Sequence, residues 1–290
     1  MDQARPAGLD LATLARYRAP RHDTTALIDR IATHLDEHDG YVAFSGGKDS
    51  TVVLDLARRT EPHVPVCFFD SGLEFPETLN HIAHLADRWK LNLQVVPARP
   101  NALEYLQSTG AWDHHAPTRN DLLRSNGFHQ ALITGPAAAA HADHGAGELW
   151  GIRTQEAPGR RALLLRGLNR EIAERCPPGC CPAPQDGRHN HQHRQRHGGI
   201  SRRADGTVAF SPVWDWLDSE IHAHLHRNHI PVNPLYARLA QLGAPPQLQR
   251  VALMVDANGA GVGRFAWLRR GWPDLFDQLA VALPRITELT

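Results

Sequence analysis

Six consecutive residues have the side chains and the backbone freedom that a phosphate-binding loop needs: Ser45, Gly46, Gly47, Lys48, Asp49 and Ser50. The glycines permit positive φ angles and close approach of a ligand to the backbone. The serines add hydroxyl donors, and the lysine adds a positive charge. Where such a turn opens a helix, backbone N–H groups and the helix dipole point at one anion. The segment therefore predicts a phosphate site; a glycine-rich turn that only caps a helix is the alternative.

This loop differs from a Walker A loop. Val42 stands where that motif has its first glycine, and Asp49 follows Lys48 in place of Ser or Thr. We therefore expect a different mode of nucleotide cleavage, in which Asp49 structures the loop or the hydration of a metal ion rather than acting as a base.

Five arginines are candidates for holding an oxyanion substrate. Arg153 follows a predicted strand, with Arg160 and Arg161 close behind it, and Arg119 and Arg124 lie in a polar segment. A guanidinium binds sulfate or phosphate through a fork of donors that lysine lacks. Solvent-facing arginines are the alternative for both groups.

Asp70 and Ser71 end the second predicted strand. Doubly wound sheets bind ligands at the carboxyl ends of their strands. We therefore expect these two residues to meet adenine or ribose; a capped helix start is the alternative.

Strands that alternate with helices are expected to position these residues. Helical spacing of Leu27, Ile31 and Leu35 predicts a helical segment over residues 1–40. Apolar runs predict strands over 41–44, 64–69, 93–96, 148–152 and 207–210, with helices between them. The pattern predicts an α/β fold with a doubly wound parallel sheet. A nucleotide-binding domain over 41–216 then contains an exposed insertion at 176–205, and a mainly helical subdomain covers 217–290.

The composition indicates a globular protein. The chain has 290 residues, of which 42% are hydrophobic. Its 31 Lys and Arg residues equal its 31 Asp and Glu residues, so no net positive charge indicates a nucleic-acid partner. The N-terminus has no apolar signal segment, and no run approaches the roughly 20 apolar residues of a membrane span. With only four cysteines, we expect a cytoplasmic protein without a membrane partner.

Cysteines and histidines gather within the predicted insertion. Cys176, Cys180 and Cys181 precede His189, His191, His193 and His197. Such ligands suit zinc or an iron–sulfur cluster, but the Cys-x3-Cys-Cys spacing matches neither a standard zinc ribbon nor a ferredoxin run. The sequence favours a His-rich insertion without metal, with a metal site as the alternative.

The loop at residues 45–50 resembles the PP-loop of the adenosine nucleotide α-hydrolase superfamily, and further segments resemble its phosphoadenosine phosphosulfate (PAPS) reductase and ATP sulfurylase branch. These segments are 69–78, with an acidic strand end before Phe-Pro-Glu-Thr, and 151–160, with Gly-Ile-Arg. Residues 210–216 and 230–236 resemble architectural segments that close such domains. Residues 117–119 with Arg124 are similar to a basic substrate segment of phage-type members. Ala157 stands where the family has Ser, and Ser125 lies near where several members have Cys.

The resemblance implies ATP with Mg²⁺ as the bound nucleotide and cleavage between its α and β phosphates. Lys48 and the loop would hold pyrophosphate, Gly151 would lie in the nucleotide site, and Arg153 and Arg160 would orient the acceptor. The acceptor implied is sulfate, or a carbonyl or nucleic-acid oxygen that would be activated for sulfur insertion.

Two other functions stay open. A reductase acting on PAPS or adenylylsulfate would need Cys180 or Cys181 as thiol, since thiol-dependent reductases carry a C-terminal Glu-Cys-Gly-Leu-His segment and no Cys follows Cys181 here. The second open function is that of a non-catalytic nucleotide-binding subunit in a larger complex. A homo-oligomer is compatible with each of these functions.

Overall fold

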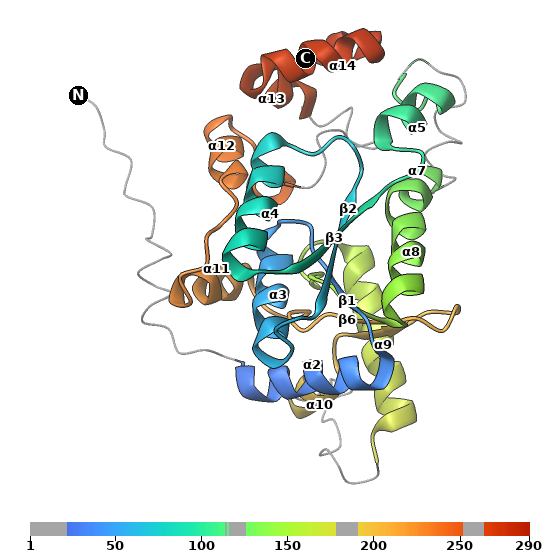
Figure 1. Cartoon of the computed structure of the whole chain (residues 1–290), viewed down its shortest axis with the longest axis vertical. Helices are drawn as coiled ribbons and strands as arrows, with labels where there is room; N and C mark the ends of the chain where they lie inside the picture. Colours follow the sequence, from blue (N-terminus) through green and yellow to red (C-terminus); the bar gives the residue numbers. More distant parts are fainter. Residues whose placement is uncertain (1–21, 114, 116–125, 178–190, 252–263) are drawn as a thin grey trace, which may run out of the picture. The chain divides into compact units, whose positions relative to one another are not determined.

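The computed structural model describes residues 22–113, 115, 126–177, 191–251 and 264–290 (Figure 1). They divide into two units. Unit 1 takes the described residues within Met1–Val42, Lys48–Val64 and Gly145–Val232, and unit 2 takes those within Ala43–Gly47, Pro65–His144 and Asn233–Thr290. The six-stranded sheet has the order β3-β2-β1-β4-β6-β5. The pairs β1–β4, β2–β3 and β4–β6 are parallel, and β5–β6 is antiparallel. The predicted α/β class is confirmed, while the division into domains at residues 40 and 216 stays a prediction.

The described residues of unit 1 form strands β1 (Tyr41–Ala43), β4 (Gly147–Leu149), β5 (Ile200–Arg202) and β6 (Val208–Phe210). Its helices are α2 (Thr24–His38), α3 (Lys48–Thr60), α9 (Pro158–Arg175), α10 (His191–His197) and α11 (Asp218–Arg227). The carboxylate of Asp23 caps α2 by accepting from the backbone N–H groups of Thr25 and Ala26. Along α3, residues 50–57 are all buried, so this helix is fixed along most of its length.

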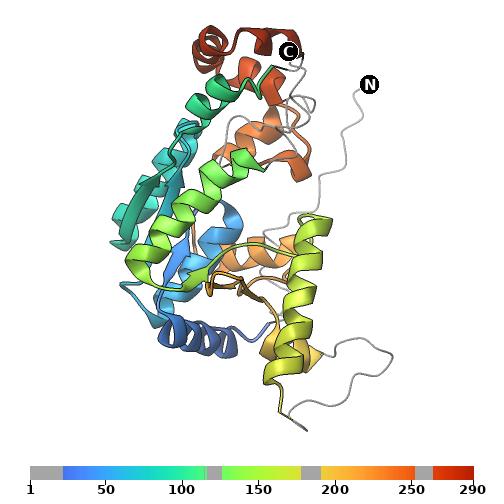
Figure 2. The same ribbon diagram turned by 90° about the vertical axis from the view of Figure 1, so that its right-hand side faces the viewer.

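One part of the predicted insertion is an ordered element of unit 1. Residues 191–202 include helix α10 and strand β5 instead of an exposed loop, and α9 lies beside both (Figure 2). Arg30 on α2 donates to the carbonyl oxygens of Gln195 at 2.6 Å and Gly198 at 2.7 Å. The side chain of His193 is buried. The sequence prediction was wrong here because α10 contains only His, Gln and Arg, so it has no apolar periodicity to read.

Unit 2 contains strands β2 (Pro65–Asp70) and β3 (Asn92–Pro97), which pair in parallel with Cys67 opposite Gln94. Its helices are α4 (Pro76–Trp89), α5 (Ala102–Thr109), α7 (Gly127–His129), η1 (Gln130–Thr134), α8 (Gly135–His144), α12 (Leu235–Gln241), η3 (Pro246–Leu248), α13 (Arg264–Gly271), α14 (Pro273–Ala282) and η4 (Pro284–Leu289). A single apolar cluster joins residues after β2 to the last helices, and it includes Phe75, Leu239, Phe265 and Trp272. The C-terminal helices of unit 2 are thus fixed to the segment that follows β2.

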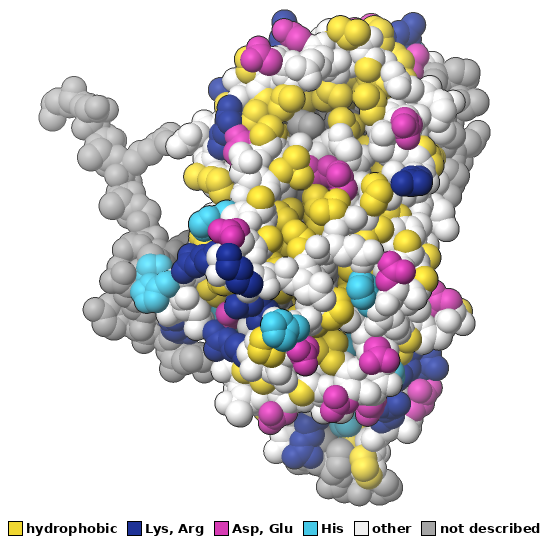
Figure 3. All heavy atoms as spheres, in the orientation of Figure 1, with side chains coloured by type: hydrophobic (Ala, Val, Ile, Leu, Met, Phe, Trp, Pro, Cys, Tyr) yellow, Lys and Arg dark blue, Asp and Glu magenta, His cyan; other side chains and the backbone are white. Residues whose placement is uncertain are grey.

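Charged side chains of both signs occur on the face drawn in Figure 3, in line with the equal numbers of basic and acidic residues. Within the described ranges, no helix combines the length and apolarity that crossing a membrane requires.

Candidate functional site

Lys48 is the first residue of α3, directly after the glycines of the loop. Its Nζ lies 2.8 Å from Oδ2 of Asp49 and 2.9 Å from Oδ1 of Asp218. Asp218 is the first residue of α11, where the helix dipole favours a negative charge. The start of α3 and the start of α11 therefore meet through an ion pair inside unit 1.

Arg153 joins the same ion pair from the segment after β4, and its side chain is only 4% exposed. Its Nη2 donates to Oδ1 of Asp218 at 3.0 Å, and its Nη1 donates to the carbonyl oxygen of Trp216 at 3.1 Å. Lys48 and Arg153 thus share one carboxylate oxygen of Asp218. We call Lys48, Asp49, Arg153 and Asp218 the phosphate-loop cluster. Two positive and two negative side chains give it no net formal charge.

One contact of the cluster lacks hydrogen-bond alignment. Nε of Arg153 lies 2.6 Å from Oδ1 of Asp49, yet both atoms are buried without an aligned hydrogen-bond partner among the described residues. A buried guanidinium normally has its donors satisfied. This N–H is therefore paired with Asp49 by charge, in a geometry that falls short of an aligned hydrogen bond.

The backbone around Gly151 explains how Arg153 reaches α3. A Cβ on Gly151 would lie 2.5 Å from the backbone nitrogen of Ser50, a distance that real Cβ atoms do not adopt. The segment is also held by Ser211, whose Oγ donates to the carbonyl oxygen of Ile152 at 2.6 Å. Glycine is required at 151 because the segment after β4 passes directly against the first turn of α3.

Asp218 is ionised in this arrangement. The hydrogen bond from His222 is the largest factor that places the pKa of Asp218 well below its usual range, and the charge of Lys48 adds to it. Nε2 of His222 lies 3.4 Å from Oδ2 of Asp218. The side chain of Asp218 is nevertheless 57% exposed, whereas that of Asp49 is 13% exposed. Of the two carboxylates in the cluster, Asp218 is the one that solvent reaches.

The other predicted arginines lie outside the cluster. Arg160, on α9, has Nη1 2.6 Å from Oε2 of Glu156, an oxygen that also accepts from the backbone N–H of Arg153. Arg160 is thus linked to Arg153 through Glu156. Arg161 is exposed on α9, and Arg119 and Arg124 lie outside the described residues.

In unit 2, the first half of the loop is held by a residue that was predicted to be architectural. Nδ2 of Asn233 donates to the carbonyl oxygen of Gly46 at 3.2 Å and to Oγ1 of Thr78 at 3.1 Å. Gly46 has a φ of +69°, which disfavours other residues. Asn233 therefore fixes the loop's carbonyl group. No local sequence signal marked this role, apart from the segment's likeness to a family motif.

The predicted contact region at Asp70 and Ser71 contains a second acidic residue, Glu74. Oε1 of Glu74 accepts from the backbone N–H of Ser71 at 2.9 Å and from its hydroxyl at 2.6 Å. Burial, followed by a hydrogen bond with Asp70, raises the pKa of Glu74 to about 7. Glu74 is a titratable group near neutral pH that the sequence analysis did not select. The contact of Asp70 and Ser71 with a nucleotide stays a prediction.

The predicted thiol and metal residues are only partly described. Cys176 is partly exposed, while Cys180 and Cys181 lie outside the described residues. Over the described ranges, no group of three or more His, Cys, Asp or Glu side chains is arranged to hold a metal ion. The metal alternative at Cys176, Cys180 and Cys181 therefore stays untested.

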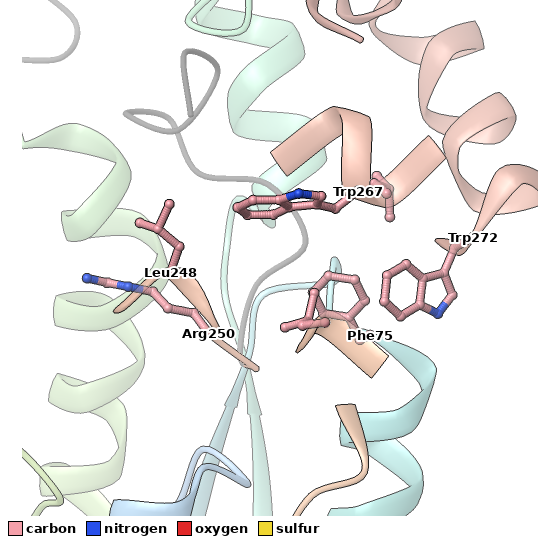
Figure 4. Close-up of a pocket in the computed structure, with 7 residues that line it drawn as sticks. Phe75, Leu248, Arg250, Trp267 and Trp272 are labelled. Atoms are coloured by element: carbon pink, nitrogen blue, oxygen red, sulfur yellow. The ribbon is translucent and has the colours of Figure 1, made fainter. Parts of the chain in front are cut away.

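Unit 2 also contains a small, mostly apolar pocket that sequence reasoning did not anticipate (Figure 4). Phe75 and Trp272 line it with ring centroids 4.7 Å apart, and Trp267 and Arg250 contribute further walls. Nε1 of Trp272 donates a hydrogen bond to Oε1 of Glu77 at 3.0 Å. The aromatic residues of the tail thus pack against the segment after β2.

An α/β sheet whose glycine-rich loop leads into a helix that starts with Lys48 defines a PP-loop protein. Residues 40–243 match the phosphoadenosine phosphosulfate reductase domain, so the chain belongs to the PAPS reductase family. This confirms the resemblance found in the sequence.

Curated relatives agree with this assignment. The chain is 27% identical over 234 residues to a phosphoadenosine 5'-phosphosulfate reductase of Alkalilimnicola ehrlichii, covering 79% of this chain and 77% of that one. It is 28% identical over 193 residues to the protein of the same name from Thiocapsa roseopersicina, covering 66% and 64%. Among solved structures, PAPS reductase from Candida auris is similar with a TM-score of 0.46 and 16% identity, covering 83% of this chain and 95% of that one.

Proposed function

We propose that the chain binds Mg²⁺-ATP and cleaves it between the α and β phosphates, transferring the adenylyl group to an oxygen acceptor. The observation that carries this proposal is the convergence of Lys48 and Arg153 on one oxygen of Asp218 at the start of α3. Two cations directed at one oxygen beside a glycine-rich helix start are the arrangement that binds a phosphate oxygen. Asp218 marks the position that the phosphate oxygen takes.

In the proposed reaction, an acceptor oxygen forms a bond to the α phosphorus, and the bond from that phosphorus to the bridging oxygen breaks. The electron pair of the broken bond leaves with pyrophosphate. Lys48 and the backbone N–H groups at the start of α3 stabilise the charge that develops on this leaving group. Arg153 orients the reacting phosphates, and Arg160 and Arg161 hold an anionic acceptor.

Mg²⁺ would accompany ATP into this site. Both oxygens of Asp49 already face cations, since Oδ1 lies 2.6 Å from Nε of Arg153 and Oδ2 lies 2.8 Å from Nζ of Lys48, so phosphate oxygens and water would be the ligands of the ion. The bound ion would neutralise phosphate charge.

A second candidate is reduction of PAPS, favoured by the names of the curated relatives. PAPS also contains an adenosine phosphate group, which the loop at residues 45–50 would bind. This reaction would need a thiol, for which Cys180 and Cys181 are the candidates in this sequence.

Product analysis distinguishes the two functions. The purified chain is incubated with Mg²⁺-ATP and sulfate, and separately with PAPS and a dithiol, while pyrophosphate and sulfite are measured. We expect pyrophosphate from ATP, and its loss in Lys48→Ala. Sulfite from PAPS without pyrophosphate from ATP would replace the first proposal with the second, and pyrophosphate release that Lys48→Ala leaves unchanged would contradict the site.

A further inference from the structure

The phosphate-loop cluster already contains an anion at the position that the proposed function gives to a phosphate. Oδ1 of Asp218 lies 2.9 Å from Nζ of Lys48 and 3.0 Å from Nη2 of Arg153. Both cations are therefore neutralised by side chains of the chain itself. A phosphate that uses both cations must take the place of this carboxylate.

Asp218 is better suited to leave than Asp49. Its side chain is 57% exposed, against 13% for Asp49, so water can solvate the carboxylate when it moves out. The helix that carries it is fixed independently of the cluster. Nε2 of His224 lies 2.7 Å from Oδ2 of Asp55, and both side chains are largely buried between α11 and α3. The side chain of Asp218 can therefore rotate while α11 keeps its position.

Arg153 supplies an independent sign that this position accepts a ligand. Its side chain is buried, and its Nε has no aligned hydrogen-bond partner in the described chain. Its 2.6 Å contact with Oδ1 of Asp49 is an ion pair without hydrogen-bond alignment, so the geometry of this donor can improve when a ligand binds. A phosphate group, which has several acceptor oxygens, can satisfy Nη2 and Nε together in a way that one aspartate oxygen does not.

We infer that Asp218 is a resident competitor for the anion position: its carboxylate occupies Lys48 and Arg153 in the free protein, and a ligand must displace it to bind. The inference rests on the proposed phosphate site. It adds that displacement of the Asp218 carboxylate sets the affinity of this site for anions. Its consequence is selectivity by charge. A ligand with several phosphate charges displaces the carboxylate, whereas a weakly charged anion does not, because the cluster as a whole is neutral.

The test is the affinity for inorganic pyrophosphate, measured by calorimetry at low ionic strength without divalent cations. Asp218→Asn keeps an oxygen that accepts from Arg153 but removes the negative charge. We expect pyrophosphate to bind about tenfold more tightly to this variant, which corresponds to about 1.4 kcal/mol. The gain should disappear in the double variant with Lys48→Ala.

Glu174→Gln is the matched control, since it also removes one negative charge in unit 1, from an exposed pair with Arg170 on α9. An equal gain in this control would overturn the inference, because it would show a general charge effect. Unchanged or weaker binding to Asp218→Asn, with normal binding to the native chain, would overturn the inference and leave the proposed function standing. Failure of both proteins to bind would overturn the phosphate site itself. Binding to Asp218→Asn alone would support the inference in its strongest form.

Discussion

The backbone of Gly151 lies so close to α3 that a single methyl group there should damage the site. In Gly151→Ala, the new Cβ would lie 2.5 Å from the nitrogen of Ser50 and 2.8 Å from the carbonyl carbon of Asp49. Both are backbone atoms, so no side-chain rotation relieves the contact. The first turn of α3 must shift or the segment that carries Arg153 must move away.

Overpacking of this kind costs about 1–3 kcal/mol. We expect Gly151→Ala to lower the free energy of unfolding, measured by urea denaturation, by that amount. Because the shift separates Arg153 from the start of α3, pyrophosphate affinity should also fall by about tenfold or more, as measured by calorimetry.

Gly159→Ala is the control. A Cβ on Gly159, in the first turn of α9, meets no atom within 4 Å, and alanine is favoured over glycine in helices by up to about 1 kcal/mol. This variant should be at least as stable as the native chain and should bind equally well. Equal stability and equal affinity of Gly151→Ala and the native chain would refute the argument that this contact positions Arg153.

Three further predictions follow from individual residues. Arg153→Lys should weaken Mg²⁺-ATP binding and reduce turnover, because a point charge keeps the attraction but loses the forked contact with phosphate; steady-state kinetics with KM and kcat both unchanged would contradict the role of Arg153 in the site. Glu74 has a folded-state pKa raised to about 7, so its contribution to stability is present at pH 4 and is lost as the pH rises through 7. In Glu74→Gln, urea denaturation should therefore show a smaller fall in stability between pH 5 and pH 8, and an unchanged slope would contradict this role. The triple Cys→Ser variant of Cys176, Cys180 and Cys181 should keep its pyrophosphate release, whereas stoichiometric metal in anaerobically purified protein together with lost activity would identify a metal site.

Most of the sheet and the loop could be predicted from the sequence because their signals are local. Strands β1, β2 and β6 consist mostly of apolar residues, and the loop is a contiguous segment with two glycines and a lysine. Helix α10 and strand β5 could not be predicted in this way. The helix has no apolar residue, and the backbone carbonyl of Gln195 near its end accepts from Arg30 on α2, which is far away in the sequence.

The candidate site was predicted in part for the same reason. Lys48 and Arg153 belong to recognisable segments, and the structure brings them together on one carboxylate. Asp218 was not selected, since a single acidic residue has no pattern that sets it apart, and Asn233 was assigned only to an architectural segment. Their roles follow from contacts with residues far away in the sequence, which only the folded chain reveals.

The most direct test of the account is the affinity of the native chain and of Lys48→Ala for Mg²⁺-ATP, measured by calorimetric titration on proteins with matching circular dichroism spectra. A charge-assisted contact to phosphate is worth about 1.5–3 kcal/mol. We expect native binding to be measurable and the variant to lose about one to two orders of magnitude in affinity. Equal affinity in the two proteins would contradict the assignment of residues 45–50 as the phosphate site.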